Sequence, residues 1–496
     1  MVDLSDFVID PETLRLLPSK VIYRKRLLPI SRQNGTLNIA TSDAFDLYAF
    51  DDIRLLTGLN IQPMLAPKDD IEKLIKAHYG LGGDTLDEMV GEDEVEISTG
   101  ETDQDLLEMA QEASVIKLVN EIILEAINER ASDIHIEPYE HILSIRYRID
   151  GILQEASLPA QMHRFQAAII SRIKILANLN IAERRIPQDG RIKFSVGNRQ
   201  IDVRVSVIPM LFGEGVVMRL LDKASVLFTL QQLGMDEETH VRFKSLVDRP
   251  HGIILVTGPT GSGKTTTLYA ALNAIVGPEI KVLTVEDPVE YHLQGVNQIP
   301  VDHKVGMTFE AGLRAILRHD PDVVMIGEIR DVETAHAAIQ ASLTGHLVLS
   351  TLHTNDAASA PTRLIDMGVE PYLISSSLIG SMAQRLVRKI CSKCSTAYQP
   401  DHASLPKDFR HVAGETLRRG AGCDHCRRTG FRGRMGLYEL MTMSEEIADK
   451  ITERAPTPKI LAVARKEGLR LLRDDGWVKV RHGLTTVEEV LTNTAL

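Results

Sequence analysis

The stretch that most constrains the fold is LVTGPTGSGKTTTLYAALNAIV, residues 255–276. Within it, residues 258–265 match the phosphate-loop pattern G-x-x-x-x-G-K-[ST]. The β-rich run GIILV precedes the pattern and the helix-forming run TTTLYAALNAIV follows it, as a phosphate loop between a strand and a helix requires. Because the N–H groups of such a loop and a helix N-terminus both favour a bound anion, the stretch predicts a nucleoside triphosphate site.

The residues expected to contact the nucleotide are those of the loop and the start of its helix. Lys264 is expected to reach the β- and γ-phosphates, and Thr265 to bind Mg²⁺. The alternative is a chance match or an inactive site, and the strand and helix beside the pattern argue against it. The expected binding residues are Gly258, Pro259, Thr260, Gly261, Ser262, Gly263, Lys264, Thr265 and Thr266.

Acidic residues follow two other apolar runs. Residues 323–326 are followed by Gly327 and Glu328, and the run in TVEDPVEY ends in Glu286 and Asp287. A carboxylate at the carboxyl end of a strand adjacent to the phosphate loop would face Mg²⁺ and the attacking water. Each acid alone is equally well explained as a surface acid or a helix cap. Beside a phosphate loop they predict a set that positions water and holds the metal, and the sequence leaves open which acid orients the water.

His353 follows the apolar run LVLSTL, again at an expected strand end. A histidine there is either a structural residue or a sensor of the γ-phosphate, and the sequence leaves both open. We therefore include His353 among the candidate catalytic residues.

Short apolar runs alternate with helical runs in this half of the chain, which predicts a parallel sheet with crossover helices. The expected strands are HGIILVTG, IKVLTVED, DVVMIGE and HLVLSTLH. Upstream, the period-2 alternation of ILSIRYRID and RQIDVRVSVIP and the amphipathic run ASVIKLVNEIILEAINER predict an α+β domain. The expected fold class is α/β, with a phosphate-loop lobe preceded by an α+β lobe.

At 496 residues the chain is too long for one core, so several domains are expected. Residues 84–105 are rich in Asp and Glu and contain no Lys or Arg, which is typical of a flexible acidic linker. The other expected domains are a small N-terminal domain (1–83), the α+β domain (106–222), the ATPase domain (223–385), a cysteine module (386–436) and a helical domain (437–496).

Charge and hydropathy argue against two classes of protein. The formal net charge of −12 disfavours a protein that coats nucleic acid, so no nucleic-acid partner is expected. No segment approaches the roughly 18 uninterrupted apolar residues of a membrane span, and MVDLSDFVID lacks the pattern of a signal peptide. We therefore expect a cytoplasmic protein that reaches a membrane only through partners.

All four cysteines fall in two Cys-x-x-Cys pairs, Cys391/Cys394 and Cys423/Cys426. Paired thiols in a reducing compartment favour metal binding over disulfides. The spacing predicts a tetrahedral Cys₄ zinc site, which is structural because four protein ligands leave no open position. The alternative is four reduced free thiols.

The order of these motifs resembles that of the ATPases of type II secretion and type IV pilus assembly. The phosphate loop is followed by TVEDPVEYHLQGVNQ at 284–298 (the Asp box), DPDVVMIGEIRD at 320–331 (Walker B) and TGHLVLSTLHTND at 344–356 (the His box), and then by the four cysteines. The resemblance implies a RecA-like ATPase lobe preceded by a PAS-like lobe, assembled into a homohexameric ring.

The resemblance also implies arginines that reach a neighbouring nucleotide from outside the phosphate loop. The matching positions are Arg204 and Arg219 in the α+β domain and Arg314 and Arg318 in LRAILRHD. An arginine fork on the γ-phosphate suits the transition state of phosphoryl transfer. Surface salt bridges account equally well for any one of these arginines.

Some relatives have a longer N-terminus with an Arg-Leu-Gly motif that binds cyclic di-GMP. No such motif precedes LRLLPSKVIYRKRLLPI, so cyclic di-GMP binding is not expected. What remains resembles the secretion-type N-terminal domain, which docks on an inner-membrane platform protein from the cytoplasmic side. The implied function is ATP hydrolysis that drives pseudopilus assembly and protein export, with ATP, Mg²⁺ and Zn²⁺ bound.

Three alternatives remain open. A type IV pilus assembly ATPase would share the chemistry and build a different filament. A DNA-translocating ATPase is disfavoured by the net charge of −12 and by the Asp and His boxes. A scaffold with an inactive phosphate loop would show no nucleotide turnover.

Overall fold

The computed structural model describes residues 9–14, 16–17, 21–22, 25–33, 35–79, 113–156, 160–196, 199–222, 228–401, 405–410 and 415–494. The expected acidic linker, residues 84–105, lies outside them. The chain divides into two compact units, Met1–Asp222 and Lys223–Leu496, and each is described by itself. In the described part of the chain, no helix is both long and apolar enough to cross a membrane.

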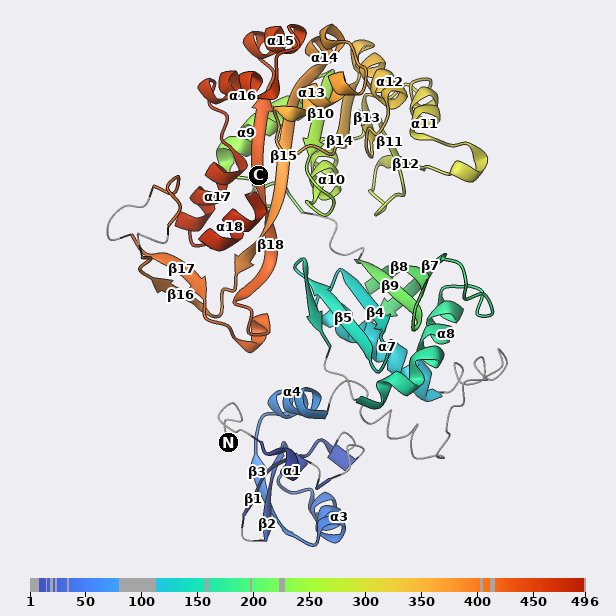
Figure 1. Cartoon of the computed structure of the whole chain (residues 1–496), viewed down its shortest axis with the longest axis vertical. Helices are drawn as coiled ribbons and strands as arrows, with labels where there is room; N and C mark the ends of the chain where they lie inside the picture. Colours follow the sequence, from blue (N-terminus) through green and yellow to red (C-terminus); the bar gives the residue numbers. More distant parts are fainter. Residues whose placement is uncertain are drawn as a thin grey trace. The chain divides into compact units, whose positions relative to one another are not determined.

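The first unit begins with a three-stranded sheet in the order β1-β2-β3 (Figure 1). β1 (Leu28–Gln33) is antiparallel to β2 (Thr36–Thr41), and β2 is parallel to β3 (Asn60–Leu65). α3 makes the crossover from β2 to β3 that a parallel pair requires. The helices packed around this sheet are α1 (Pro11–Leu14), α3 (Leu47–Thr57) and α4 (Lys68–Tyr79).

A six-stranded antiparallel sheet follows, in the order β6-β5-β4-β9-β8-β7. On β8, Ile201, Val203, Val205 and Val207 are buried in one core with α7 and α8, as the alternation in the sequence predicts. The strands are β4 (Asp133–Pro138), β5 (Leu143–Ile149), β6 (Ile152–Glu155), β7 (Gln188–Val196), β8 (Arg199–Met210) and β9 (Gly213–Asp222), and the helices are α7 (Ala113–Asn128), η2 (Ala160–Phe165) and α8 (Gln166–Leu176).

The second unit is built on a seven-stranded sheet in the order β12-β11-β13-β14-β10-β15-β18. The first six strands are parallel, and β18 is antiparallel to β15. The four expected strands are all present, and each is buried along its length because helices cover both faces of the sheet. They are β10 (Gly252–Thr257), β11 (Val282–Glu286), β13 (Val323–Ile326) and β14 (Leu347–Leu352), and β12 (Val296–Pro300) lies at the edge.

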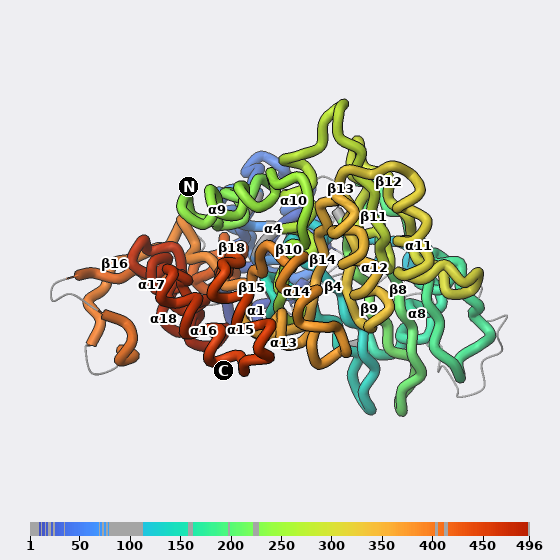
Figure 2. Tube along the Cα trace, turned by 90° about the horizontal axis from the view of Figure 1, so that it is seen from above, coloured from blue at the N-terminus to red at the C-terminus, as the bar shows by residue number. Residues whose placement is uncertain are grey.

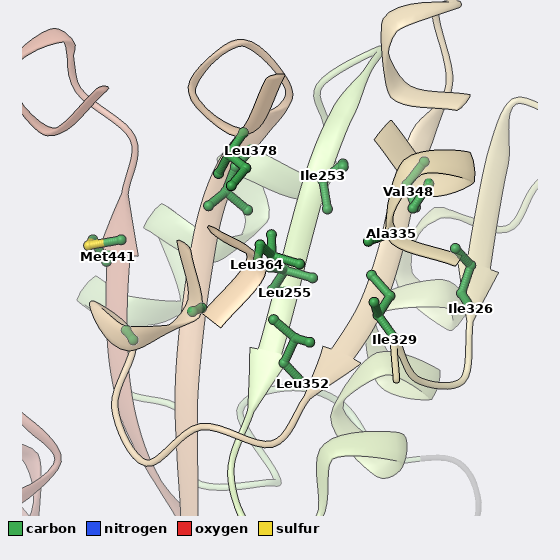
Figure 3. Packing of buried hydrophobic residues seen from close by; sticks show 14 of the residues in the cluster. Ile253, Leu255, Ile326, Ile329, Ala335, Val348, Leu352, Leu364, Leu378 and Met441 are labelled. Atoms are coloured by element: carbon green, nitrogen blue, oxygen red, sulfur yellow. The ribbon is translucent and has the colours of Figure 1, made fainter. Parts of the chain in front are cut away.

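Alternate residues of β10 belong to two different cores. Ile253 and Leu255 pack with α11 to α16 (Figure 3), whereas Ile254 and Val256 pack with α9 and α10. Figure 2 shows α10 on one side of β10 and α13 and α14 on the other. The helices are α9 (Glu237–Val247), α10 (Lys264–Ile275), η4 (His303–Val305), α11 (Phe309–Ile316), α12 (Val332–Leu343), α13 (Ser359–Asp366), α14 (Pro371–Ser377), α15 (Glu445–Thr452) and α16 (Thr457–Lys466).

The cysteine module lies between two long paired strands, β15 (Leu378–Ile390) and β18 (Phe431–Thr442) (Figure 1). The domain boundaries expected at 385/386 and 436/437 therefore fall inside these strands, because both continue the central sheet. Within the module, β16 (Ser395–Tyr398) pairs with β17 (Leu417–Gly420), and η6 spans Asp424–Cys426. α17 (Leu472–Arg481) and α18 (Val487–Thr494) then pack against β18 and β15.

Candidate nucleotide-binding site

The phosphate loop joins β10 to α10, and its shape depends on glycine. Gly263, the N-cap of α10, has φ 86°, and Gly258 has φ 148°. A Cβ on Gly258 would lie 2.5 Å from the carbonyl oxygen of Gln384 and 2.7 Å from Ser262 Oγ, so no side chain fits there. The loop thus packs directly on the carboxyl-terminal half of β15.

Lys264 lies within this loop. Its Nζ donates to the carbonyl oxygens of Gly258 at 2.8 Å and Pro259 at 3.1 Å. Burial lowers the pKa of Lys264, although the Glu328 carboxylate acts in the opposite direction. Ser262 Oγ is buried and has no hydrogen-bond partner among the residues that the structure describes. A buried cation and an unsatisfied hydroxyl in one loop fit a bound polyphosphate.

The rest of the loop is accessible to a ligand. Pro259, Thr260 and Gly261 are exposed, and Thr266 is half-buried. Thr265 is exposed on the first turn of α10. Because Mg²⁺ prefers oxygen ligands, the Thr265 hydroxyl fits the expected metal-binding role.

Glu328 lies two residues beyond the end of β13 and contacts two basic side chains. His353 Nε2 lies 3.2 Å from Glu328 Oε2, and Arg330 donates to Glu328 Oε1. Burial raises the pKa of Glu328, but the hydrogen bonds and charges of Arg330 and His353 outweigh it and hold the pKa below its usual range. The structure therefore brings an ionised Glu328 together with His353 at the same edge of the sheet as the phosphate loop.

The strand of Glu328 is not the direct neighbour of the strand that leads into the phosphate loop, because β14 lies between β13 and β10. The end of β13 is tied to β14 instead. Ile329 N donates to Thr351 O at 3.0 Å, and Thr351 Oγ1 donates to Gly327 O at 2.7 Å. Since His353 directly follows β14, it meets Glu328 at the strand end that lies beside β10.

Glu286, the other expected catalytic acid, lies in a separate buried network. It is 2% exposed and accepts hydrogen bonds from Thr284 Oγ1 at 2.6 Å, from Gln298 Nε2 at 3.0 Å and from the Tyr269 hydroxyl. Burial and the Glu286 carboxylate raise the pKa of Tyr269. Tyr269 belongs to α10, so the network joins the end of β11 to the helix of the phosphate loop. Asp287, the residue after Glu286, lies outside this network, and its Oδ2 is 3.7 Å from His303 Nε2.

This geometry predicts that Glu286→Gln acts mainly on stability. The substitution places an amide NH₂ among three donors, and a disrupted buried network of charged hydrogen bonds costs about 2 kcal/mol. We expect Tm to fall by about 4 to 8 °C, with the dissociation constant for ATP little changed. Calorimetric melting and nucleotide titration measure both quantities, and exposed Glu279→Gln is the matched control. Unchanged Tm with a large loss of ATP hydrolysis would instead make Glu286 the catalytic acid.

Arg314 and Arg318 are not brought to the phosphate loop of their own unit. They lie on or just after α11, which packs on the face of the sheet opposite α10. Arg314 pairs with Glu310 at 2.6 Å, and Arg318 Nη1 donates to the carbonyl oxygen of Arg314 at 2.9 Å. Both are therefore placed on an outer surface of the second unit.

Arg204 and Arg219 lie on the first unit, directly opposite each other on β8 and β9. Arg191 on β7 is opposite Arg204 in turn. Arg219 Nε donates to Asp133 Oδ1 at 3.0 Å and is 57% exposed. Arg191, Arg204 and Arg219 therefore form a row of basic residues across three neighbouring strands.

Arg330 is a site residue that the motifs did not indicate. Its guanidinium contacts Glu328 and also senses the charge of Asp287. The only signal in the sequence is its position two residues after the acid in GEIRD. Spacing alone does not distinguish such an arginine from a solvated surface residue.

The four cysteines form one cluster, with all four Sγ atoms within 4.8 Å of one another. Three Sγ pairs lie 3.7 to 3.9 Å apart. A tetrahedral zinc with Zn–S bonds of about 2.3 Å requires about 3.8 Å between sulfurs. Burial raises the pKa of the Cys426 thiol, but N–H donation from Cys423 and Gly430 outweighs it and lowers that pKa to about 7. The cluster therefore fits a zinc ion bound by thiolates.

Two families match this chain. The family described as "Type II/IV secretion system protein" matches residues 108–492, and the MshEN domain matches residues 1–85. The chain is 43% identical over 505 residues to the type IV pilus assembly ATPase PilB of Myxococcus xanthus, covering 100% of this chain and 88% of that one. It is 46% identical over 481 residues to the type II secretion system protein E of Xanthomonas campestris pv. campestris, covering 96% and 84%.

Among solved structures, the fold is similar to the X-ray structure of the Legionella pneumophila ATPase DotB. The TM-score is 0.57 at 21% sequence identity, over 75% of this chain and 94% of that one. This likeness confirms the α/β fold of the ATPase lobe. With the match over residues 108–492 and the two long alignments to relatives, it follows that the chain belongs to the family of type II secretion and type IV pilus assembly ATPases.

Proposed function

We propose that this protein hydrolyses ATP at the phosphate loop to drive assembly of a filament by a type II secretion system. The proposal rests on one observation: the phosphate loop, His353 and Glu328 follow the ends of three neighbouring strands, β10, β14 and β13, and His353 contacts Glu328. Lys264 holds the phosphates, Thr265 holds Mg²⁺, and Glu328 orients the attacking water. A Mg²⁺ ion held with the help of the Thr265 hydroxyl would supply positive charge beside the phosphates.

We infer that the active form is a homohexamer. Arg314 and Arg318 lie on the face opposite α10, so they suit a neighbouring subunit's nucleotide better than their own. Arg204 and Arg219 lie opposite each other on β8 and β9 of the first unit, and both are proposed for the same role. ATP hydrolysis would then depend on assembly, because arginines at the γ-phosphate stabilise the transition state.

The remaining features support a motor that works at a membrane through partners. Residues 1–83 would dock on an inner-membrane platform protein from the cytoplasmic side, and the Cys₄ zinc would hold the module between β15 and β18. Type IV pilus assembly is the second candidate, because PilB of M. xanthus aligns with the whole chain at an identity close to that of protein E of X. campestris.

The test is deletion of the gene, complemented by the wild type or by Lys264→Ala. Secreted proteins and surface pili are scored in parallel. Loss of secretion with pili intact, not rescued by Lys264→Ala, is the expected result. The exposed Lys304→Ala, on the same unit, is the matched control and should complement fully.

Loss of pili with secretion intact would assign the protein to pilus assembly and leave the ATPase chemistry in place. Full complementation by Lys264→Ala would contradict a motor that works by ATP hydrolysis at this loop.

A further inference from the structure

Arg385 lies at the edge of the phosphate site, although no nucleotide-binding motif includes it. β15 is the parallel neighbour of β10, with Ala383 opposite Thr257. The next two residues of β15, Gln384 and Arg385, therefore flank the start of the phosphate loop. Arg385 Nη1 would lie 3.2 Å from a Cβ on Gly258.

Among the described residues, the guanidinium of Arg385 donates hydrogen bonds only to neutral acceptors. Nη2 donates to Asn355 Oδ1 at 3.1 Å, and Nη1 to the carbonyl oxygen of Gln384 at 3.3 Å. No ion pair to a carboxylate is recorded for it within the described residues. Burial lowers the pKa of Arg385, while the charges of Glu439 and Asp356 act in the opposite direction. A half-buried cation without a paired anion is costly, and that cost is offset when an anion binds.

The two nearby acids are already engaged elsewhere. Glu439 accepts hydrogen bonds from Ala357 N at 2.8 Å and Leu472 N at 3.2 Å, and Asp356 accepts from Ser359. In the part of the chain that the structure describes, neither carboxylate forms an ion pair with Arg385.

Two cations converge on the same loop. The charge of Arg385 contributes to lowering the pKa of Lys264, so the two groups are close enough to repel each other. Both groups lie at Gly258, where Lys264 Nζ donates to the carbonyl oxygen. Such repulsion is relieved by a polyanion between the two cations, and a guanidinium fork matches phosphate oxygens.

We propose that Arg385 is a further nucleotide-binding residue, which donates to the polyphosphate chain of the nucleotide held by the phosphate loop. The inference rests on the proposed function, because it requires that the loop binds ATP. The competing role is structural, in which Arg385 only ties β15 to the loop after β14 through Asn355.

The test is isothermal titration of the full chain with MgADP and with the slowly hydrolysed MgATPγS. Charge-assisted hydrogen bonds to phosphate predict that Arg385→Gln weakens both affinities by about 10- to 100-fold. Arg385→Lys keeps the charge but lacks the fork, so an intermediate loss is expected. The matched control is Lys389→Gln, which removes one exposed positive charge from the same strand and should leave both affinities unchanged.

Thermal melting separates the two roles. Removal of an unpaired half-buried cation should leave the Tm of the nucleotide-free protein equal or higher, while the rise in Tm on adding MgADP becomes smaller. Wild-type affinity in Arg385→Gln would overturn the proposal. The proposal would also be overturned if Arg385→Gln lowered the Tm of the nucleotide-free protein and Asn355→Ala caused the same fall in Tm and the same loss of affinity. Absence of nucleotide binding by the wild type would contradict the proposed function itself and not this inference alone.

Discussion

Glu328→Gln is expected to lower the rate of ATP hydrolysis at saturating MgATP by about 100-fold or more, with ATP binding preserved. The substitution conserves shape and still offers Arg330 an acceptor oxygen. It removes the negative charge that faces His353 and that, in the proposed mechanism, orients the attacking water. Because the proposal assigns phosphate binding to Lys264 and the loop, the loss should fall on kcat.

The measurement is steady-state phosphate release combined with nucleotide titration for each variant. Glu333→Gln, an exposed acid in the first turn of α12, is the matched control and should retain wild-type kcat. A Glu328→Gln protein that turns over ATP normally would remove Glu328 from the catalytic machinery. A larger loss in Glu286→Gln would transfer the role to the buried acid.

The sequence alone predicts the phosphate loop and the buried strands well, because their signals are local. β10, β11, β13 and β14 are short, mainly apolar runs, and each is where the pattern predicts it. The period-2 face of β8 is likewise buried as expected. Both signals depend on residues that are close in the chain.

The environments of the two acids could not be predicted in this way. Glu286 and Glu328 both follow apolar strands, so their local sequences are equivalent. What separates them is packing between elements, because Tyr269 of α10 and Gln298 of β12 enclose Glu286, whereas His353, which follows β14, meets Glu328. The strand order that inserts β14 between β13 and β10 is also a property of the whole sheet.

The β15–β18 pair is a second feature that the sequence did not reveal. The segment GLYELMT at 436–442 lacks period-2 alternation because both of its faces are covered, so it does not read as a strand. Its partner strand is separated from it by the cysteine module, and a pairing over that distance leaves no local signal. Arg385 was missed for a similar reason, since the parallel pairing of β15 with β10, and not any local pattern, places it beside Gly258.

Removal of zinc is expected to separate the cysteine module from α17, with a red shift in the fluorescence of Trp477. This is the single tryptophan of the chain, and it is 4% exposed. Its Nε1 donates to Asp408 Oδ2 at 3.2 Å, and its ring lies 5.1 Å from that of Phe409. Leu417, at the start of β17, belongs to the same core. Trp477 therefore reports on the packing of the module.

The reason is that β16 and β17 form a two-stranded sheet, which is marginal without support. One cysteine pair directly precedes β16 and the other closely follows β17, so a structural zinc, worth on the order of 10 kcal/mol at pH 7, would hold the sheet closed. Cys426→Ser should lower the zinc content from one ion per chain and shift the emission of Trp477 as a chelator does. Thr396→Ser on β16 keeps all four ligands and is the matched control. Added zinc should reverse the effect of the chelator in the wild type. If the emission of Trp477 does not change with the chelator, with zinc or in Cys426→Ser, the packing of the module does not depend on a metal.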